Sequence, residues 1–146
     1  MQVVAAPGGY FDEVLRTAKP RPSGVEPRRE RLAVLEALAG CSERELEMVE
    51  RLVAEVTVAA GTTMLRQGWP GCHALIVATG EALVVRNGEP VARVGRGRWL
   101  GERALLTGGV HDGTVLAATP MRVFVADPRQ FATLTTLAGV ARNLQA

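Results

Sequence analysis

Short apolar segments, each closed by a glycine, divide the middle of the chain from Glu55 to Gly95. In order they read EVTVAAG, TTMLRQG, HALIVATG, EALVVRNG and EPVARVG. Apolar runs of this length with a period near two are typical of β-strands, and glycine readily takes the positive φ that many tight turns require. Strands this short at near-regular spacing predict an all-β barrel or sandwich for this part of the chain.

The strand pattern continues to Asp127 with one interruption. Asn87 and Gly88 lie between LVV and VARV and predict a two-residue type I′ hairpin turn, because both residues tolerate positive φ. The segment GRGRWLGERALLTGG then predicts a turn and a short helix that begins near Glu102. Two further strands, TVLAAT and MRVFVAD, are expected on either side of Pro120.

Helices are expected before and after the strands. The segment RRERLAVLEALAG has leucines at three-residue intervals and predicts a short helix that stops at Gly40. Ser42 and Glu45 have the spacing of a capping box, so a helix is predicted over about residues 43–54. A closing helix is expected after Asp127, a good N-cap residue that is followed by proline. The fold class is therefore mainly β with flanking helices.

The two ends of the chain are predicted to lie outside the domain. Residues 1–30 are interrupted so often by proline and glycine that we expect a flexible N-terminal tail. Within it, residues 10–16 could form a short amphipathic helix that docks on a protein partner. The domain is expected over residues 31–138, and residues 139–146 are expected to be a short C-terminal tail.

Composition argues against several classes of protein. The 17 basic and 15 acidic residues give a net charge of only +2, which favours no nucleic-acid partner. Cys41 and Cys72 have no metal-ligand spacing, so we expect reduced thiols, no metal site and a cytoplasmic location. No segment approaches the roughly 20 apolar residues of a membrane span. No catalytic motif is present either, so an enzyme is not expected.

Taken in order, three segments resemble the cyclic nucleotide-binding domain family, the sensor module of bacterial catabolite activator proteins and of protein kinase A regulatory subunits. They are LAGCSERELEMVERLVAEVTVAAGTTMLRQGWPG, ALIVATGEALVV and GRGRWLGERALLTGGVHDGTVLAATPMRVFVAD. The resemblance covers about residues 32–138. It implies a cyclic nucleotide-binding-type β-barrel, a double-stranded β-helix or jelly roll, with cyclic AMP as the candidate ligand.

The resemblance also implies where the ligand binds. In the family, a short helix presents backbone amides to the cyclic phosphate, and here that helix is the GERALL segment. Gly101 matches the glycine that lets the backbone approach the ligand, and Glu102 matches the glutamate that accepts a hydrogen bond from the ribose 2′-hydroxyl. The implied ligand-binding residues are Gly101, Glu102, Arg103, Ala104, His111, Asp112, Gly113 and Thr114.

The chain departs from the family at the residue that anchors the phosphate. Where the family has Gly-Gly-Pro-Arg-Thr-Ala-Thr-Val or a close variant, this chain reads GGVHDGTV, so His111 replaces the arginine. Histidine is only partly charged near neutral pH and cannot form the two parallel hydrogen bonds of a guanidinium. Asp112 adds a carboxylate beside it. Arg103 is the first candidate to substitute for the missing arginine, with Arg96 and Arg98 as further candidates.

Two functions remain open. The first is a regulatory domain that binds cyclic AMP with weakened or altered affinity, in which His111 and Asp112 form a remodelled site. The second is a degenerate barrel that binds no nucleotide, acts as a structural or protein-interaction module and exposes that loop. No helix-turn-helix is expected after the barrel, and TLAGVARNLQA is at most a stub of the family's dimerisation helix. Trp69 and Trp99 are expected to pack over the barrel ends.

Overall fold

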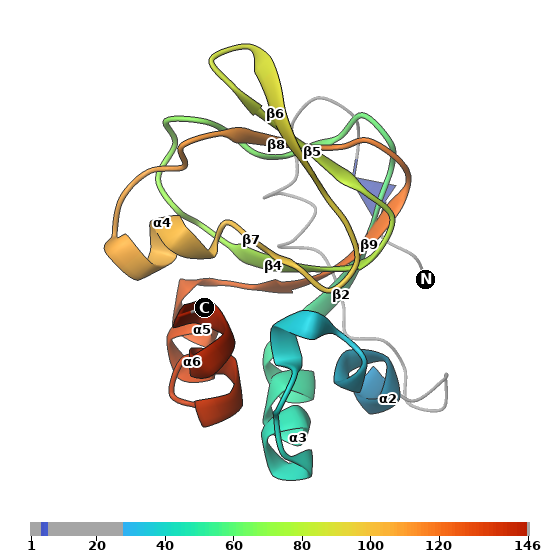
Figure 1. The fold of residues 1–146 in the computed structure, drawn as a ribbon, viewed down its shortest axis with the longest axis vertical. Coiled ribbons are helices and arrows are strands. Elements are labelled where there is room, and N and C mark those ends of the chain that lie inside the picture. The colour runs from blue at the N-terminus through green and yellow to red at the C-terminus, as the bar shows by residue number, and fades with distance from the viewer. Residues whose placement is uncertain (1–3, 6–27, 146) are drawn as a thin grey trace.

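The computed structural model describes residues 4–5 and 28–145 of the chain, and Figure 1 shows their arrangement. The proposed docking segment at residues 10–16 lies outside the described residues, as does most of the expected tail at residues 1–30. None of the helices among residues 28–145 combines the length and apolar character needed to cross a membrane. The described side chains also form no cluster of three or more potential metal ligands.

The strands form two sheets that face each other, as the glycine-closed apolar segments predicted. One has the order β1-β2-β9-β4-β7 and the other the order β3-β8-β5-β6. All pairs are antiparallel except the short parallel pair of β1 and β2. The strands are β1 Val4–Ala5, β2 Ala54–Val58, β3 Thr63–Leu65, β4 Ala74–Thr79, β5 Ala82–Arg86, β6 Glu89–Val94, β7 Trp99–Leu100, β8 Thr114–Ala117 and β9 Met121–Ala126.

The first apolar core fills the space between the two sheets. Alternate residues of the strands point into it, because successive side chains of a strand lie on opposite faces. Val56 and Val58 of β2 show this period, as do Leu75 and Val77 of β4. The remaining members are Met64, Leu65, Ala82, Leu100, Val115, Ala117, Met121, Val123 and Val125.

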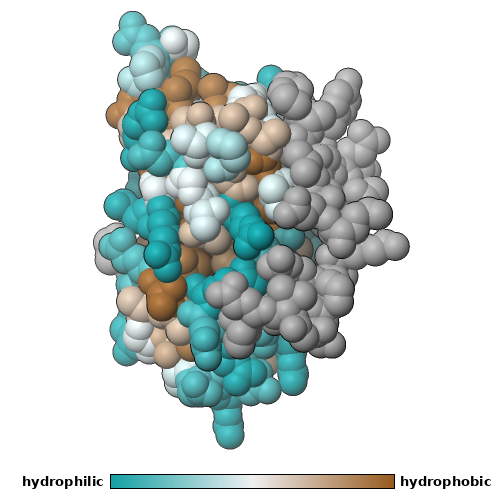
Figure 2. Space-filling model, turned by 90° about the vertical axis from the view of Figure 1, so that its right-hand side faces the viewer, coloured by the Kyte–Doolittle hydropathy of each residue, from teal (hydrophilic) through white to brown (hydrophobic). Residues whose placement is uncertain are grey.

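A second apolar core lies on the outer face of the five-stranded sheet, under the helices. The intervening residues Ile76 of β4 and Phe124 of β9 belong to it, so both faces of these two strands are buried. This explains why HALIVATG and MRVFVAD read as nearly continuous apolar runs. The helices that cover the sheet are α2 Arg28–Ala33, the 3-10 helix η1 Glu36–Leu38, α3 Glu43–Leu52, α5 Pro128–Leu134 and α6 Ala138–Gln145. Figure 2 shows a mostly hydrophilic surface over the lower, helical part of the molecule.

Most local predictions are confirmed. Asn87 and Gly88 have φ values of 52° and 81°, as the type I′ hairpin requires. Ser42 and Glu45 form the expected capping box at the start of α3. Asp127 caps α5, and Gln130 completes a second capping box there.

The segment 28–40 differs from the single helix that was predicted. Helix α2 ends at Ala33, and the chain continues through the extended Leu35 into η1. The amide of Ala37 donates a hydrogen bond to the carbonyl of Gly97, with an N–O distance of 2.7 Å. In a continuous helix, the Ala37 amide would donate to a carbonyl of the same helix. The hydrogen bond from Ala37 to the barrel therefore goes together with the break after Ala33.

The expected C-terminal tail at residues 139–146 also differs from the structure. Residues 138–145 form α6, and Val140 is fully buried against the other helices. Gly139 lies so close to Cys41 that a Cβ on it would be 2.7 Å from the Cys41 sulfur. The Asn143 side chain donates to the carbonyls of Ala39 and Gly139. Helix α6 has only eight residues, too few for the sequence to show a clear helical period.

The two tryptophans have different environments. Trp99 packs against Phe131 of α5 in an edge-to-face arrangement with 5.6 Å between ring centroids, so it packs as predicted but under the helices, at the second core. Trp69 is 56% exposed and lies under the guanidinium of Arg66, so its prediction as a packing cap is wrong.

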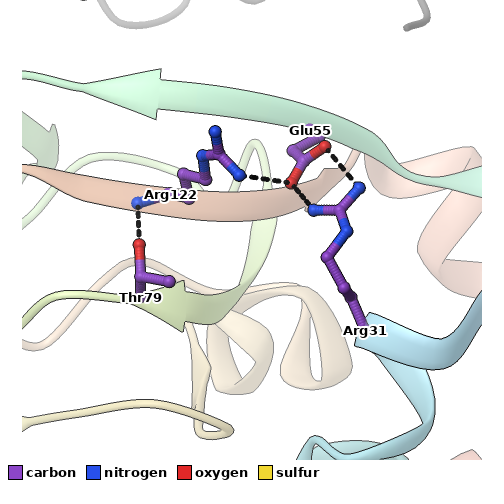
Figure 3. A network of polar contacts seen from close by, with 4 residues as sticks. All are labelled: Arg31, Glu55, Thr79 and Arg122. Atoms are coloured by element: carbon purple, nitrogen blue, oxygen red, sulfur yellow. Dashed lines mark hydrogen bonds and ion pairs between the residues drawn. The ribbon is translucent and has the colours of Figure 1, made fainter. Parts of the chain in front are cut away.

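A buried ion-pair network joins α2 to the five-stranded sheet (Figure 3). The Glu55 carboxylate on β2 is 5% exposed and accepts two hydrogen bonds from the Arg31 guanidinium. Arg122 of β9 approaches the same carboxylate to 4.0 Å, and its backbone amide donates to the hydroxyl of Thr79 on β4. One acidic group therefore holds cations from a helix and from the neighbouring strand.

Glu55→Gln is expected to destabilise the domain by about 3 kcal/mol, because it removes the negative charge that the guanidinium groups of Arg31 and Arg122 share. Urea unfolding monitored by circular dichroism measures this change. Glu81→Gln is the matched control, since Glu81 pairs with Arg93 at 2.9 Å but both side chains are more than half exposed. The control is expected to cost less than about 1 kcal/mol. Equal losses in the two variants would contradict the assigned role of the network.

Candidate functional site

A cavity of about 280 Å³ lies between the four-stranded sheet and helix α4, Glu102–Thr107. Leu65, Val84 and Val115 contribute apolar side chains from β3, β5 and β8. The polar part of the wall comes from the start of α4 and from the loop before β8. The candidate ligand-binding residues that line the cavity are Gly101, Glu102, Arg103, Ala104, His111, Asp112 and Gly113.

Gly101 forms the turn between β7 and α4. Its φ of 78° and ψ of −3° place it in the left-handed region, where glycine is favoured. A Cβ at this position would lie 2.7 Å from the carbonyl oxygen of His73 and 2.9 Å from a methyl carbon of Leu65. Both the backbone conformation and these close contacts therefore require glycine at this turn in the cavity wall.

Glu102 is half-buried at the start of α4. Its Oε2 atom is buried and has no hydrogen-bond partner among the described residues. Burial raises the pKa of this carboxyl above its ordinary value, and the negative charge of Asp112 acts in the same direction. Backbone amides at the start of α4 and the charge of Arg103 oppose the shift. This oxygen is free to accept a hydrogen bond from a hydroxyl group in the cavity.

His111 is 8% exposed and belongs to a paired segment. Its amide donates to the carbonyl of Trp69 at 3.0 Å, and its carbonyl accepts from the amide of Gly68 at 2.8 Å. Pro70 forms an isolated antiparallel bridge with Val110 beside it. The interpretation of this loop as exposed is therefore wrong for His111. The segment 68–71 could not be recognised from the sequence as a neighbour of His111, because the two are about 40 residues apart in the chain.

The His111 imidazole faces the turn at Gly101. Its Cε1 atom is 3.5 Å from the point that a Cβ of Gly101 would occupy. His111 thus lies beside the turn at Gly101 in the cavity wall.

Asp112 and Thr114 have partners that the sequence did not reveal. The side chain of Asp112 is 74% exposed and forms an ion pair at 3.4 Å with Arg86, the last residue of β5. The hydroxyl of Thr114 accepts a hydrogen bond from the amide of Gln67, and Thr114 does not line the cavity. The alternating pattern of β5 could have placed Arg86 at the end of a strand, but only the pairing of β5 with β8 brings it to this loop.

The three candidate substitutes for the arginine lie in different places. Arg103 is exposed and lines the cavity. Arg98 lines a neighbouring groove of about 470 Å³ between α4, η1 and α6. Arg96 is exposed and is among the lining residues of neither space. Trp99, Glu102 and Arg103 line both the cavity and the groove, so the two spaces share a wall.

Comparison with known proteins agrees with this architecture. The model of the family described as "Cyclic nucleotide-binding domain" matches residues 55–136. Acetyltransferase Pat of Mycolicibacterium smegmatis is 31% identical over 123 residues, which are 82% of this chain and 37% of the acetyltransferase. The cGMP-dependent protein kinase egl-4 of Caenorhabditis briggsae is 30% identical over 103 residues, 70% of this chain and 14% of the kinase. The chain thus spans well under half the length of these two relatives.

Solved structures confirm the expected jelly-roll fold. The regulatory subunit of a cAMP-independent protein kinase A from Trypanosoma brucei matches with a TM-score of 0.73 and 23% identity, over 81% of this chain and 46% of that one. A mutant of that subunit with cAMP bound in its A site also gives 0.73, at 22% identity over the same shares. The catabolite activator protein of Thermus thermophilus gives 0.68 and 22% identity, over 75% of this chain and 55% of that one.

Glu102→Gln is expected to change how stability depends on pH. Because the pKa of the buried carboxyl is raised, its ionisation costs the folded state stability as the pH rises above the ordinary value of 4.5. The melting temperature of the variant should therefore rise relative to the wild type as the pH increases from about 4.5 towards neutrality. Thermal unfolding at a series of pH values measures this, with Glu89→Gln on β6 as the same chemical change outside the cavity. A melting temperature of Glu102→Gln that falls relative to that of the wild type as the pH increases would contradict the assigned environment of Glu102.

Proposed function

The chain belongs to the cyclic nucleotide-binding domain family, and we propose that it binds cyclic AMP in the cavity beside α4, more weakly than a domain with arginine at position 111. The observation that carries the proposal is the buried Glu102 oxygen, which has no partner among the described residues and lies next to the side-chain-free turn at Gly101. The cavity volume of about 280 Å³ is near the lower end of the range for small-molecule sites.

The polar groups suggest how the ligand is oriented. The cyclic phosphate lies beside the turn at Gly101 and within reach of His111, since both residues line the cavity. The ribose hydroxyl then donates a hydrogen bond to Glu102, whose ionised form this contact favours. The apolar side chains of Leu65, Val84 and Val115 cover the remaining wall.

The exchange of arginine for histidine accounts for the weaker binding. A hydrogen bond to a charged group contributes about 1.5–3 kcal/mol, so losing the guanidinium lowers the affinity by about one to two decades. Arg103 adds a positive charge at the cavity wall. Binding is therefore retained at reduced strength.

Binding is proposed to regulate a partner surface rather than a catalytic step. Trp99, Glu102 and Arg103 line both the cavity and the groove next to η1 and α6. A ligand that contacts Glu102 therefore changes a wall against which the C-terminal helix lies, and this favours one arrangement of α4 and α6 over others. The kinase egl-4 and the acetyltransferase Pat are longer proteins, and the chain matches 14% and 37% of their lengths.

The second candidate function is a module that binds no nucleotide. The buried His111 and the Asp112 carboxylate favour this second function, because neither side chain offers the phosphate a permanent positive charge. The two matched Trypanosoma brucei structures share this fold, and they are described as the subunit of a cAMP-independent kinase and its cAMP-bound mutant.

His111→Arg is expected to tighten the binding of cyclic AMP by about one to two decades, because it restores a permanently charged fork at the phosphate. Isothermal titration calorimetry of the wild type and the variant measures the two affinities. Val91→Arg is the control, since it adds the same charge at an exposed position on β6. No saturable binding by the wild type or by His111→Arg at millimolar ligand would contradict the proposal and favour the second candidate.

A further inference from the structure

Arg86 holds the loop before β8 at the rim of the cavity. Its Nε donates to the backbone carbonyl of Asp112 at 3.1 Å, and its terminal nitrogen lies 3.4 Å from the carboxylate of the same residue. One guanidinium thus contacts both the main chain and the side chain of a residue that lines the cavity. Arg86 itself is not among the lining residues.

The end of the β5–β6 hairpin is fixed against this loop from two sides. Val85 pairs with Thr114, which places Arg86 at the level of Gly113. A Cβ on Gly113 would lie 3.2 Å from a methyl carbon of Val84, so the loop lies close to β5.

On the other side, the Gln67 side chain exchanges two hydrogen bonds with Asn87 in the hairpin turn. The Gln67 amide donates to the hydroxyl of Thr114. Arg86 therefore projects from a well-fixed position.

Arg86 also changes the net charge around the cavity. The ionisable groups that line the cavity are Glu102, Asp112, Arg103 and His111. Without Arg86, two carboxylates would face an incoming cyclic phosphate with one permanent cation among them. With its guanidinium 3.4 Å from the Asp112 carboxylate, Arg86 offsets the charge of that carboxylate.

The ion pair contributes little to folding. The side chains of Arg86 and Asp112 are 48% and 74% exposed, and pairs this exposed add less than about 1 kcal/mol to stability. Variants at either position are therefore expected to fold.

We propose that Arg86 is a positioning residue for nucleotide binding, which holds the loop of Asp112 in place and neutralises its carboxylate. It supplies from outside the cavity part of the positive charge that the loop lacks at His111. This inference rests on the proposed binding of a cyclic nucleotide. It makes the Arg86 side chain on β5 a determinant of the binding affinity.

The test uses two substitutions that break the same ion pair and leave opposite charges behind. Arg86→Gln leaves the Asp112 carboxylate uncompensated and is expected to weaken cyclic AMP binding by about fivefold at low salt. Asp112→Asn leaves the Arg86 cation and is expected to strengthen binding by a similar factor. Arg86→Lys should retain most of the wild-type affinity, and about 0.5 M salt should reduce every one of these shifts. Calorimetric titration with cyclic AMP measures all of them.

Arg93→Gln is the matched control, because Arg93 pairs with Glu81 in an exposed ion pair whose residues do not line the cavity. It should leave the affinity unchanged. Shifts in the same direction for Arg86→Gln and Asp112→Asn would show a merely structural pair and overturn this inference while leaving the proposed function intact. No binding by the wild type, by Asp112→Asn or by Arg86→Lys at millimolar ligand would overturn the proposed function itself, and this inference with it.

Discussion

Burial of the five-stranded sheet on both of its faces is the constraint on which the structure depends. In β4 and β9, one set of alternate side chains fills the barrel and the other set lies under the helices. Removing either layer would expose to water the face of these strands that the layer covers. The Glu55 carboxylate fastens α2 to this sheet, and the link from Ala37 to Gly97 joins η1 to the turn before β7. The cavity wall beside α4 begins at the end of that strand.

The sequence was sufficient for the features that depend on local chemistry. Positive φ at Asn87 and Gly88, and the capping box at Ser42, follow from what these residue types do in isolation. The break after Ala33 and the helix at residues 138–145 did not follow. Both depend on contacts with distant segments, such as the packing of Gly139 on Cys41.

The same distinction applies to the candidate site. Gly101 and Glu102 could be identified because the short motif around them is continuous in the chain. The pairing of His111 with the segment 68–71 and the approach of Arg86 to Asp112 are products of the fold. The sequence showed a histidine where the resemblance implies an arginine, but only the strand pairing reveals that a charge from β5 reaches the same loop. The proposed site thus combines a glycine and a glutamate that match the family with a different arrangement of positive charge.

The most direct test of this account is a titration of the ¹⁵N-labelled domain with cyclic AMP, followed by amide chemical shifts. The account predicts saturable shifts that centre on Gly101, Glu102 and the loop from 109 to 113, with smaller shifts in α6. The strands far from the cavity, such as β6, should serve as an internal reference and remain unchanged. Absence of any saturable shift at millimolar cyclic AMP, or shifts confined to residues away from α4 and this loop, would contradict it.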